Sequence, residues 1–241
     1  MSSGAEVTAP AAPSSPAGGA LDEFLRPGPT VQSQDPWVKA LTDRVAGGAA
    51  SDRERAVALY YAVRDDIRYD PYSSELTIEG LSARRTLEIG RGWCVSKAIL
   101  LAACCRAAGV PARLGFADVR NHLSTAKMRE RMQTDVFYWH GYTSIHLDGS
   151  WLKATPAFNV ELCDRFGLAA LEFDGTEDSI YHPFDLAGNR HMEYLRYRGE
   201  FAEPPIEDIL ATFRAEYPHW REDYLGSSEG DFEAEVRAEI R

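Results

Sequence analysis

The sequence lacks several features that would assign it to particular protein classes. No apolar run approaches the roughly 18 residues that a membrane-spanning helix needs. The N-terminus has no basic region followed by an apolar core, so we expect no signal peptide, a cytoplasmic location and no membrane partner. Basic residues are also few: 26 Lys and Arg face 37 Asp and Glu, for a net charge of -11. We therefore expect no nucleic-acid partner, because phosphate binding needs a basic face.

Cysteine is scarce as well, and its spacing matches no metal site. The chain has Cys94, Cys104, Cys105 and Cys163, without the C-x-x-C or Cys/His spacing of a zinc centre. Cys104 and Cys105 are neighbours on a predicted helix, where side chains point about 100° apart, so an ordinary disulfide between them is excluded. The simplest expectation is four reduced thiols.

The remaining composition is that of an ordinary globular domain. Apolar residues make up 44% of the 241 residues and charged residues 26%. We expect residues 1–30, rich in Ala, Pro, Ser and Gly, to be disordered, with order beginning between Leu21 and Pro36. Residues 31–225 are predicted to form one domain. Residues 226–241 form an acidic tail, predicted to be a frayed helix or one that docks on a partner.

Capping signals and apolar periodicity predict a mixed α+β fold. An Asp35-Pro36 start and a Ser51 capping box open two helices, and an almost wholly apolar stretch predicts a buried third one. An Asp-Gly turn at 148–149 predicts a hairpin. The expected helices cover 36–46, 52–68, 82–88, 95–108 and 205–217; the expected strands cover 112–119, 136–147 and 151–155, with two more within 170–198 and a loop with one helical turn at 120–134.

Cys94 stands where the Gly90 to Gly92 break meets the start of the buried helix. A helix N-terminus presents free N–H groups and a partial positive charge. A thiol there is expected to have a lowered pKa and to be a good nucleophile, while nearby amides could hold an oxyanion. Cys104 and Cys105, inside the helix, are expected to be small core residues.

The hairpin supplies a candidate base, His140. With Asp148-Gly149 as the turn, facing positions sum to 297, so His140 lies opposite Ala157. Its diagonal neighbours on the same face are Thr155 and Asn159, within side-chain reach. Either could orient the imidazole. His182 and His191 flank a Pro/Gly-rich loop, where a packing role is the simpler interpretation.

Two segments resemble a known family. Gly92-Trp93-Cys94 and the apolar helix after it, ending in Gly109-Val110-Pro111, resemble the nucleophile helix of transglutaminase-like proteins, which belong to the papain-like superfamily of cysteine enzymes. The run from His140 to Trp151 resembles the histidine hairpin of the same family. The resemblance covers about residues 35–160 and implies a nucleophile helix packed on an antiparallel sheet. It also implies a Cys…His…Asp triad that forms a thioester, with Cys94 as nucleophile and His140 as base.

The sequence differs from the family pattern at the third member of that triad. The acidic residue of the family precedes a Pro just after a Trp, and here that place is Thr155. A hydroxyl can fix the ring but cannot stabilise an imidazolium as a carboxylate does. Asn159 could act in the same way, and Asp174 or Asp178 could instead fold back to His140.

Two hypotheses follow. The first is a cysteine enzyme that transfers or hydrolyses acyl groups at an amide, ester or thioester bond of a peptide, protein or small molecule, with no metal or organic cofactor. Trp93, Tyr138, Trp139 and Tyr142 could wall its acyl pocket. The second is a catalytically inactive module of the same fold that binds peptides or scaffolds an assembly. Substrate, acyl acceptor and oligomeric state stay open.

Overall fold

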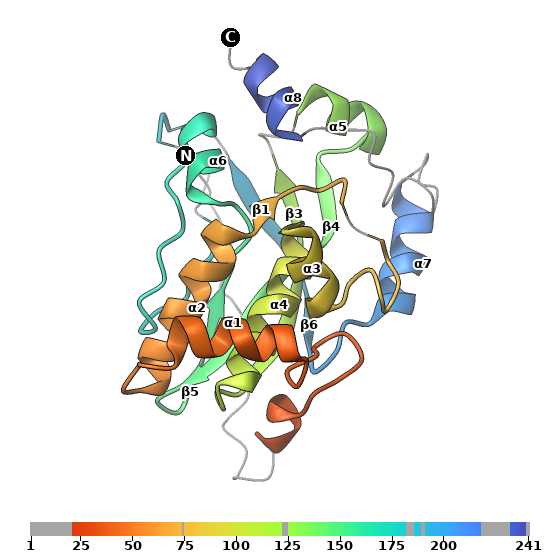
Figure 1. Cartoon of the computed structure of the whole chain (residues 1–241). Coiled ribbons are helices and arrows are strands. Elements are labelled where there is room, and N and C mark those ends of the chain that lie inside the picture. Colours follow the sequence, from red (N-terminus) through yellow and green to blue (C-terminus); the bar gives the residue numbers. More distant parts are fainter. Residues whose placement is uncertain are drawn as a thin grey trace, which may run out of the picture.

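The computed structural model describes residues 21–73, 75–121, 125–181, 186–188, 191–217 and 232–239. They form an α+β fold, as the sequence predicts, with the helices of residues 36–107 gathered over one face of a sheet (Figure 1). In chain order the elements are η2 (Asp22–Leu25), α1 (Pro36–Ala46), α2 (Asp52–Asp66), β1 (Arg68–Tyr69), α3 (Ala83–Ile89), β2 (Arg91–Gly92), α4 (Cys94–Ala107), β3 (Ala112–Asn121), α5 (Ala126–Met132), β4 (Val136–Leu147), β5 (Ser150–Ala154), α6 (Val160–Phe166), β6 (Met192–Phe201), α7 (Ile206–Glu216) and α8 (Phe232–Glu239).

The main sheet is antiparallel, with strand order β5-β4-β3-β6. Its hairpin register is the predicted one, because Ser144 pairs with Lys153. The β4–β5 ladder ends at the pair Thr143 and Ala154, so it stops before reaching His140. Within 170–198 the described residues hold one strand, the start of β6, and an isolated bridge at Ser179, instead of the two expected strands.

Helix α4 lies between the sheet and helices α1, α2 and α3 (Figure 1). It is buried from Cys94 to Arg106, as expected for a helix that is apolar on all sides. Its one lysine, Lys97, is also fully buried and donates from Nζ to the carbonyl oxygen of Arg64 at 2.9 Å and to that of Ile67. Lys97 thus binds the carbonyl groups that are left free at the C-terminal end of α2.

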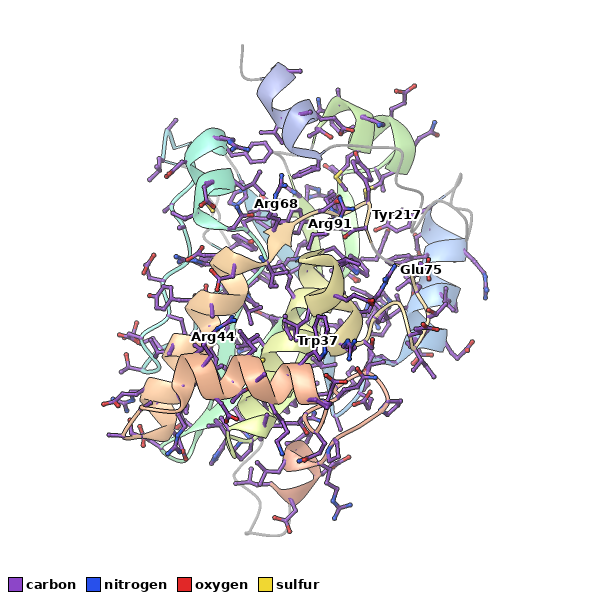
Figure 2. All side chains as sticks on the ribbon, viewed as in Figure 1. Trp37, Arg44, Arg68, Glu75, Arg91 and Tyr217 are labelled. Atoms are coloured by element: carbon purple, nitrogen blue, oxygen red, sulfur yellow. The ribbon has the colours of Figure 1, made fainter. Side chains whose placement is uncertain are left out.

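A short parallel pairing leads the chain into α4. Strand β1 pairs with β2, with Arg68 opposite Arg91 and Tyr69 opposite Gly92. The two arginines lie next to each other on the exposed side of this pair (Figure 2). Tyr69 is buried and faces the start of α4, so the pairing fixes an aromatic ring beside Cys94.

Both ends of the described chain depart from the expected domain limits. Residues 1–20 lie outside the described residues, whereas 21–30 are described and contain η2, ahead of the expected boundary at 31. The Glu203 carboxylate accepts from the Thr30 N–H at 2.9 Å and from its hydroxyl, and this contact anchors the segment.

The C-terminal helix α8 packs on the chain itself. Phe232 and Val236 are buried, and the Phe232 ring lies 5.6 Å from that of Tyr69. Residues 218–231 lie outside the described residues. No helix in the described part of the chain is long and apolar enough to cross a membrane.

Candidate active site

Cys94 is the first residue of α4, and the residues around it explain the sharp entry into that helix. The Trp93 N–H donates to the Ser96 hydroxyl at 3.1 Å, which satisfies one donor at the helix start. A Cβ at Gly92 would clash with the same hydroxyl, so a larger residue there would displace the Ser96 side chain from this hydrogen bond. Cys94 is 6% exposed and lines a cavity.

Strand β4 approaches the start of α4 at the residue after His140. A Cβ on Gly141 would lie 2.9 Å from the Cα of Val95, so only glycine lets the strand come this close. The ladder to β5 has already ended at Thr143, and the Gly141 N–H donates to the sulfur of Cys94. The N–H of Val95 also favours the thiolate. These backbone donors form a cradle for negative charge beside the sulfur.

The pKa of Cys94 is nevertheless raised, to about 11, because burial disfavours the thiolate. The backbone N–H groups of Gly141 and Val95 lower the pKa, but less than burial raises it. The prediction of a lowered pKa from the helix N-terminus is therefore wrong for this state of the site. The reason is that the helix start lies under the β4 strand and not at the surface.

His140 is buried, at 6% exposure, and its environment favours the neutral imidazole. Burial and, to a smaller extent, the charge of the nearby His191 lower its pKa to about 4. Its Nε2 is buried and has no hydrogen-bond partner among the described residues. The Tyr181 ring lies 5.7 Å from the imidazole and 5.4 Å from the ring of His191, so the three rings form one cluster. A neutral imidazole can accept a proton, which is what a general base must do.

Thr155 is buried, and its backbone is held by hydrogen bonds. Its N–H donates to the carbonyl oxygen of Ser179 at 3.0 Å, and its own carbonyl oxygen accepts from the hydroxyl of Tyr60 at 3.2 Å. Its side chain contacts the Tyr194 hydroxyl, and this contact partly offsets the effect of burial on the pKa of that tyrosine. Within the described chain, no hydrogen bond joins Thr155 to His140.

The other candidates for orienting His140 have partners elsewhere. Asn159 accepts from the Tyr69 N–H at 3.1 Å and donates to Glu161 at 2.9 Å. Asp174 binds the backbone and hydroxyl of Thr176, and Asp178 binds Lys153. Neither aspartate contributes to the pKa of His140, which reflects burial and His191.

A β-bulge immediately before His140 sets the direction of β4. Tyr138 and Trp139 together oppose the single residue Asp118, between the pairs His140–Ala117 and Phe137–Val119. The bulge puts Phe137 and His140 on the same face of the strand. Trp139 takes a left-handed conformation, with φ of 60°, which is rare for an aromatic residue.

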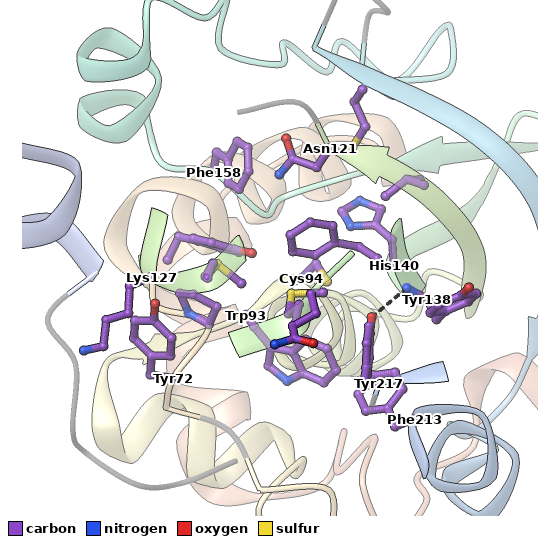
Figure 3. Close-up of a pocket in the computed structure, with 18 of the residues that line it drawn as sticks. Tyr72, Trp93, Cys94, Asn121, Lys127, Tyr138, His140, Phe158, Phe213 and Tyr217 are labelled. Atoms are coloured by element: carbon purple, nitrogen blue, oxygen red, sulfur yellow. Dashed lines mark hydrogen bonds between the residues drawn. The ribbon is translucent and has the colours of Figure 1, made fainter. Parts of the chain in front are cut away.

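Both N–H groups that the bulge removes from the ladder find partners. The Tyr138 N–H donates to the Tyr217 hydroxyl at 3.0 Å, drawn as a dashed line in Figure 3. The Trp139 N–H donates to the Asp118 carboxylate at 3.1 Å. Arg198 in turn binds that buried carboxylate at 2.8 to 2.9 Å. Asp118 thus holds the backbone on which His140 sits.

Cys94 and His140 point into one cavity of about 520 Å³ (Figure 3). The cavity is bounded by the start of α4, the bulged part of β4, α5 and the end of α7, and its lining is mostly aromatic and apolar. Of the four predicted wall residues, Trp93 and Tyr138 line it. Trp139 and Tyr142 are buried elsewhere: the Trp139 indole donates to Thr212, and Tyr142 packs over Gly115.

Three residues beside the site were missed or undervalued by sequence reasoning. Asp118 carried a signal, as the carboxylate within the predicted strand 112–119. His191, for which packing is the simpler interpretation, is buried beside His140. Tyr181 gave no signal. His182 lies outside the described residues.

Comparison with protein families matches residues 39–156 to the transglutaminase-like superfamily. Among solved structures, a candidate cysteine protease from Cytophaga hutchinsonii is 21% identical with a TM-score of 0.45, over 57% of this chain and 42% of that one. A candidate protease from Parabacteroides distasonis ATCC 8503 is 16% identical with a TM-score of 0.37, over 56% and 25%. This chain therefore spans less than half of either protein. No curated protein sequence matches it.

Proposed function

The chain belongs to the transglutaminase-like superfamily through residues 39–156, and on this premise we propose that it is a cysteine enzyme of acyl transfer or hydrolysis. Cys94 attacks the carbonyl carbon of an amide, ester or thioester and becomes acylated. His140 takes the thiol proton and returns it to the leaving group. The supporting observation is that the sulfur and the imidazole line one cavity, with the Gly141 and Val95 N–H groups at the sulfur.

The burial of both groups defines how the proton moves. With pKa values of about 11 for Cys94 and about 4 for His140, the resting pair is a neutral thiol and a neutral imidazole. The thiolate is therefore generated during attack, as the imidazole accepts the proton, and not stored beforehand. Because both groups are neutral at rest, a substrate can replace water in the cavity without leaving an unpaired charge buried beneath it.

Thr155 is proposed as the residue nearest in role to the family aspartate. It is buried and stands at the matching place, after Trp151 and before Pro156. A hydroxyl partner gives the imidazolium less stabilisation than a carboxylate does. We therefore expect a slower enzyme than one with a complete Cys…His…Asp triad.

One observation favours a second function, a module that binds but does not catalyse. Among the described residues, no carboxylate contributes to the pKa of His140, and Thr155 Oγ1 makes no hydrogen bond to its imidazole. In this alternative Cys94 is a buried thiol of the cavity wall, and the cavity binds an apolar side chain of a peptide.

Turnover of p-nitrophenyl butyrate, with and without n-butylamine as acyl acceptor, separates the two functions. An enzyme releases p-nitrophenolate catalytically, and the amide yield reports transfer against hydrolysis. Cys94→Ala should abolish turnover, and His140→Ala should lower kcat by about 10²–10⁴-fold with little change in KM.

The matched control is Cys104→Ala, which removes a thiol of the same helix that does not line the cavity. It should keep wild-type turnover. Equal rates for the wild type and Cys94→Ala would contradict the proposed enzyme and favour the binding module.

A further inference from the structure

We propose that the cavity beside Cys94 selects acyl donors whose acyl group is apolar, an alkyl chain or an aryl ring, and rejects acyl groups that carry a negative charge. This inference rests on the proposed function, because it describes the group that the Cys94 thioester would hold. It follows from the two walls at the sulfur, the polar groups of the cavity and its size.

Aromatic rings face the sulfur from two sides (Figure 3). On one side the Trp93 ring lies 6.3 Å from that of Phe213, which lies 4.9 Å from that of Tyr217. On the other side the Tyr69 ring meets that of Phe158 edge-on at 4.7 Å. A carbonyl carbon bonded to the sulfur would therefore direct the rest of its acyl group along aromatic surface.

The polar groups of the lining gather at the α5 edge, and the cation there is already paired. The cationic side chain among the described lining residues is that of Lys127. Its Nζ lies 3.0 Å from the carboxylate of Glu235 on α8, which also accepts from the Tyr72 hydroxyl at 2.8 Å. A carboxylate on the acyl group would lose water in this cavity and find its counterion already engaged.

The size of the cavity fits a small acyl group. Its volume of about 520 Å³ is within the usual range of small-molecule sites, about 300–1,000 Å³. Burial of each additional methylene against these walls should raise kcat/KM about fourfold.

The proposed step is balanced with a p-nitrophenyl ester. The sulfur of Cys94 forms a bond to the carbonyl carbon, the carbon–oxygen bond breaks, and p-nitrophenolate leaves with the electron pair. The thiol proton passes to His140 and then to solvent. Water next gives a proton to His140 as its oxygen attacks the thioester; the carboxylic acid leaves, and the sulfur regains a proton from the imidazolium.

The test compares p-nitrophenyl esters of acetate, butyrate and hexanoate with the adipoyl half-ester. The hexanoyl and adipoyl groups have the same length up to the end, where a carboxylate replaces a methyl group. The values of kcat/KM are first divided by the rate constant for hydrolysis of each ester by hydroxide. The corrected kcat/KM of the hexanoyl ester should then exceed that of the acetyl ester on the order of a hundredfold. It should exceed that of the adipoyl ester at least tenfold.

A designed switch of specificity provides a second readout. Phe137 lines the cavity and is partly exposed, so a lysine there can place its ammonium group in the cavity. Phe137→Lys should lower the ratio of kcat/KM for the hexanoyl ester to kcat/KM for the adipoyl ester at least tenfold. Phe137→Leu, the matched control, should leave that ratio unchanged.

The outcomes separate this inference from the proposed function. Acylation of Cys94 with acetyl or adipoyl as the preferred group, or an unchanged ratio in Phe137→Lys, would overturn the inference and leave the enzyme in place. Failure of every ester to acylate Cys94 would overturn both.

Discussion

The two sides of the cavity, one carrying Cys94 and the other His140, are held in different ways. Cys94 is fixed by its own neighbours, since Gly92, Trp93 and Ser96 together make the helix start. His140 is fixed by distant segments: a carboxylate on β3, an arginine on β6 and a tyrosine after α7 hold the bulge before it. Substitutions on the sulfur side should therefore act locally, whereas those on the imidazole side should also disturb the sheet.

The largest expected effect is on the imidazole side. Asp118→Ala removes the acceptor of the Trp139 N–H and leaves Arg198, which is mostly buried, without its partner. Breaking a buried pair in this way typically costs about 3–5 kcal/mol of unfolding free energy. Urea unfolding should show this loss, and turnover should fall even where the variant is fully folded.

Asp118→Asn is the matched control, since its amide oxygen can still accept from the Trp139 N–H. It should lose less stability and retain more activity than Asp118→Ala. Equal losses in the two variants would show that the acceptor for the bulge does not position His140.

On the sulfur side, Lys97 gives a pH-dependent stability. Burial lowers its pKa to about 7, below its ordinary value of 10.5, so between these values the unfolded chain binds a proton that the folded chain does not. Its contribution to stability therefore rises with pH in that window and is constant below it. From pH 7.5 to 8.5 the gain is roughly 1 kcal/mol.

Urea unfolding of Lys97→Met, a neutral side chain of similar length, checks this value. The wild type should gain stability relative to the variant as the pH rises from 7.5 to 8.5. A constant difference between the two proteins would mean that Lys97 stays protonated in the folded chain.

The pH profile of activity should reflect the burial of His140. The base is active in its neutral form, so kcat/KM should fall on the acid side near pH 4, where His140 becomes protonated. An unperturbed histidine would lose activity near pH 6.5. Measuring kcat/KM from pH 4 to 9 in buffers of constant ionic strength separates the two. An acid-side midpoint near pH 6.5 would contradict the burial of the imidazole and indicate that it is hydrated.

The smallest expected effect concerns His191, whose charge lowers the pKa of His140 less than burial does. His191→Phe keeps a ring against Tyr181 and Phe158 while removing that charge. The acid midpoint should move upward by less than one pH unit, because desolvation remains. A downward shift would contradict a repulsive contact between the two histidines.

The contrast between local and distant support also explains which features could be predicted from the sequence. The helices, the hairpin and its register depend on caps, turns and periodicity within short segments, and these predictions are confirmed, from the Asp35 cap to the Ser144–Lys153 pair. The raised pKa of Cys94 could not be foreseen, because it depends on β4 lying over the helix start. The sequence marks Asp118 only as a carboxylate within a predicted strand, and its role at the bulge could not be foreseen, since a bulge is a property of two paired strands. The catalytic roles of Cys94, His140 and Thr155 stay predictions.

Acyl transfer by Cys94 and His140 is tested most directly by the mass of the enzyme during turnover. Rapidly quenched protein should carry one butyryl group after mixing with p-nitrophenyl butyrate, and peptide mapping should place it on Cys94. Its formation should be at least about 10²-fold slower in His140→Ala and unchanged in Cys104→Ala. An acyl group on any other residue, or equal rates with and without His140, would contradict the account.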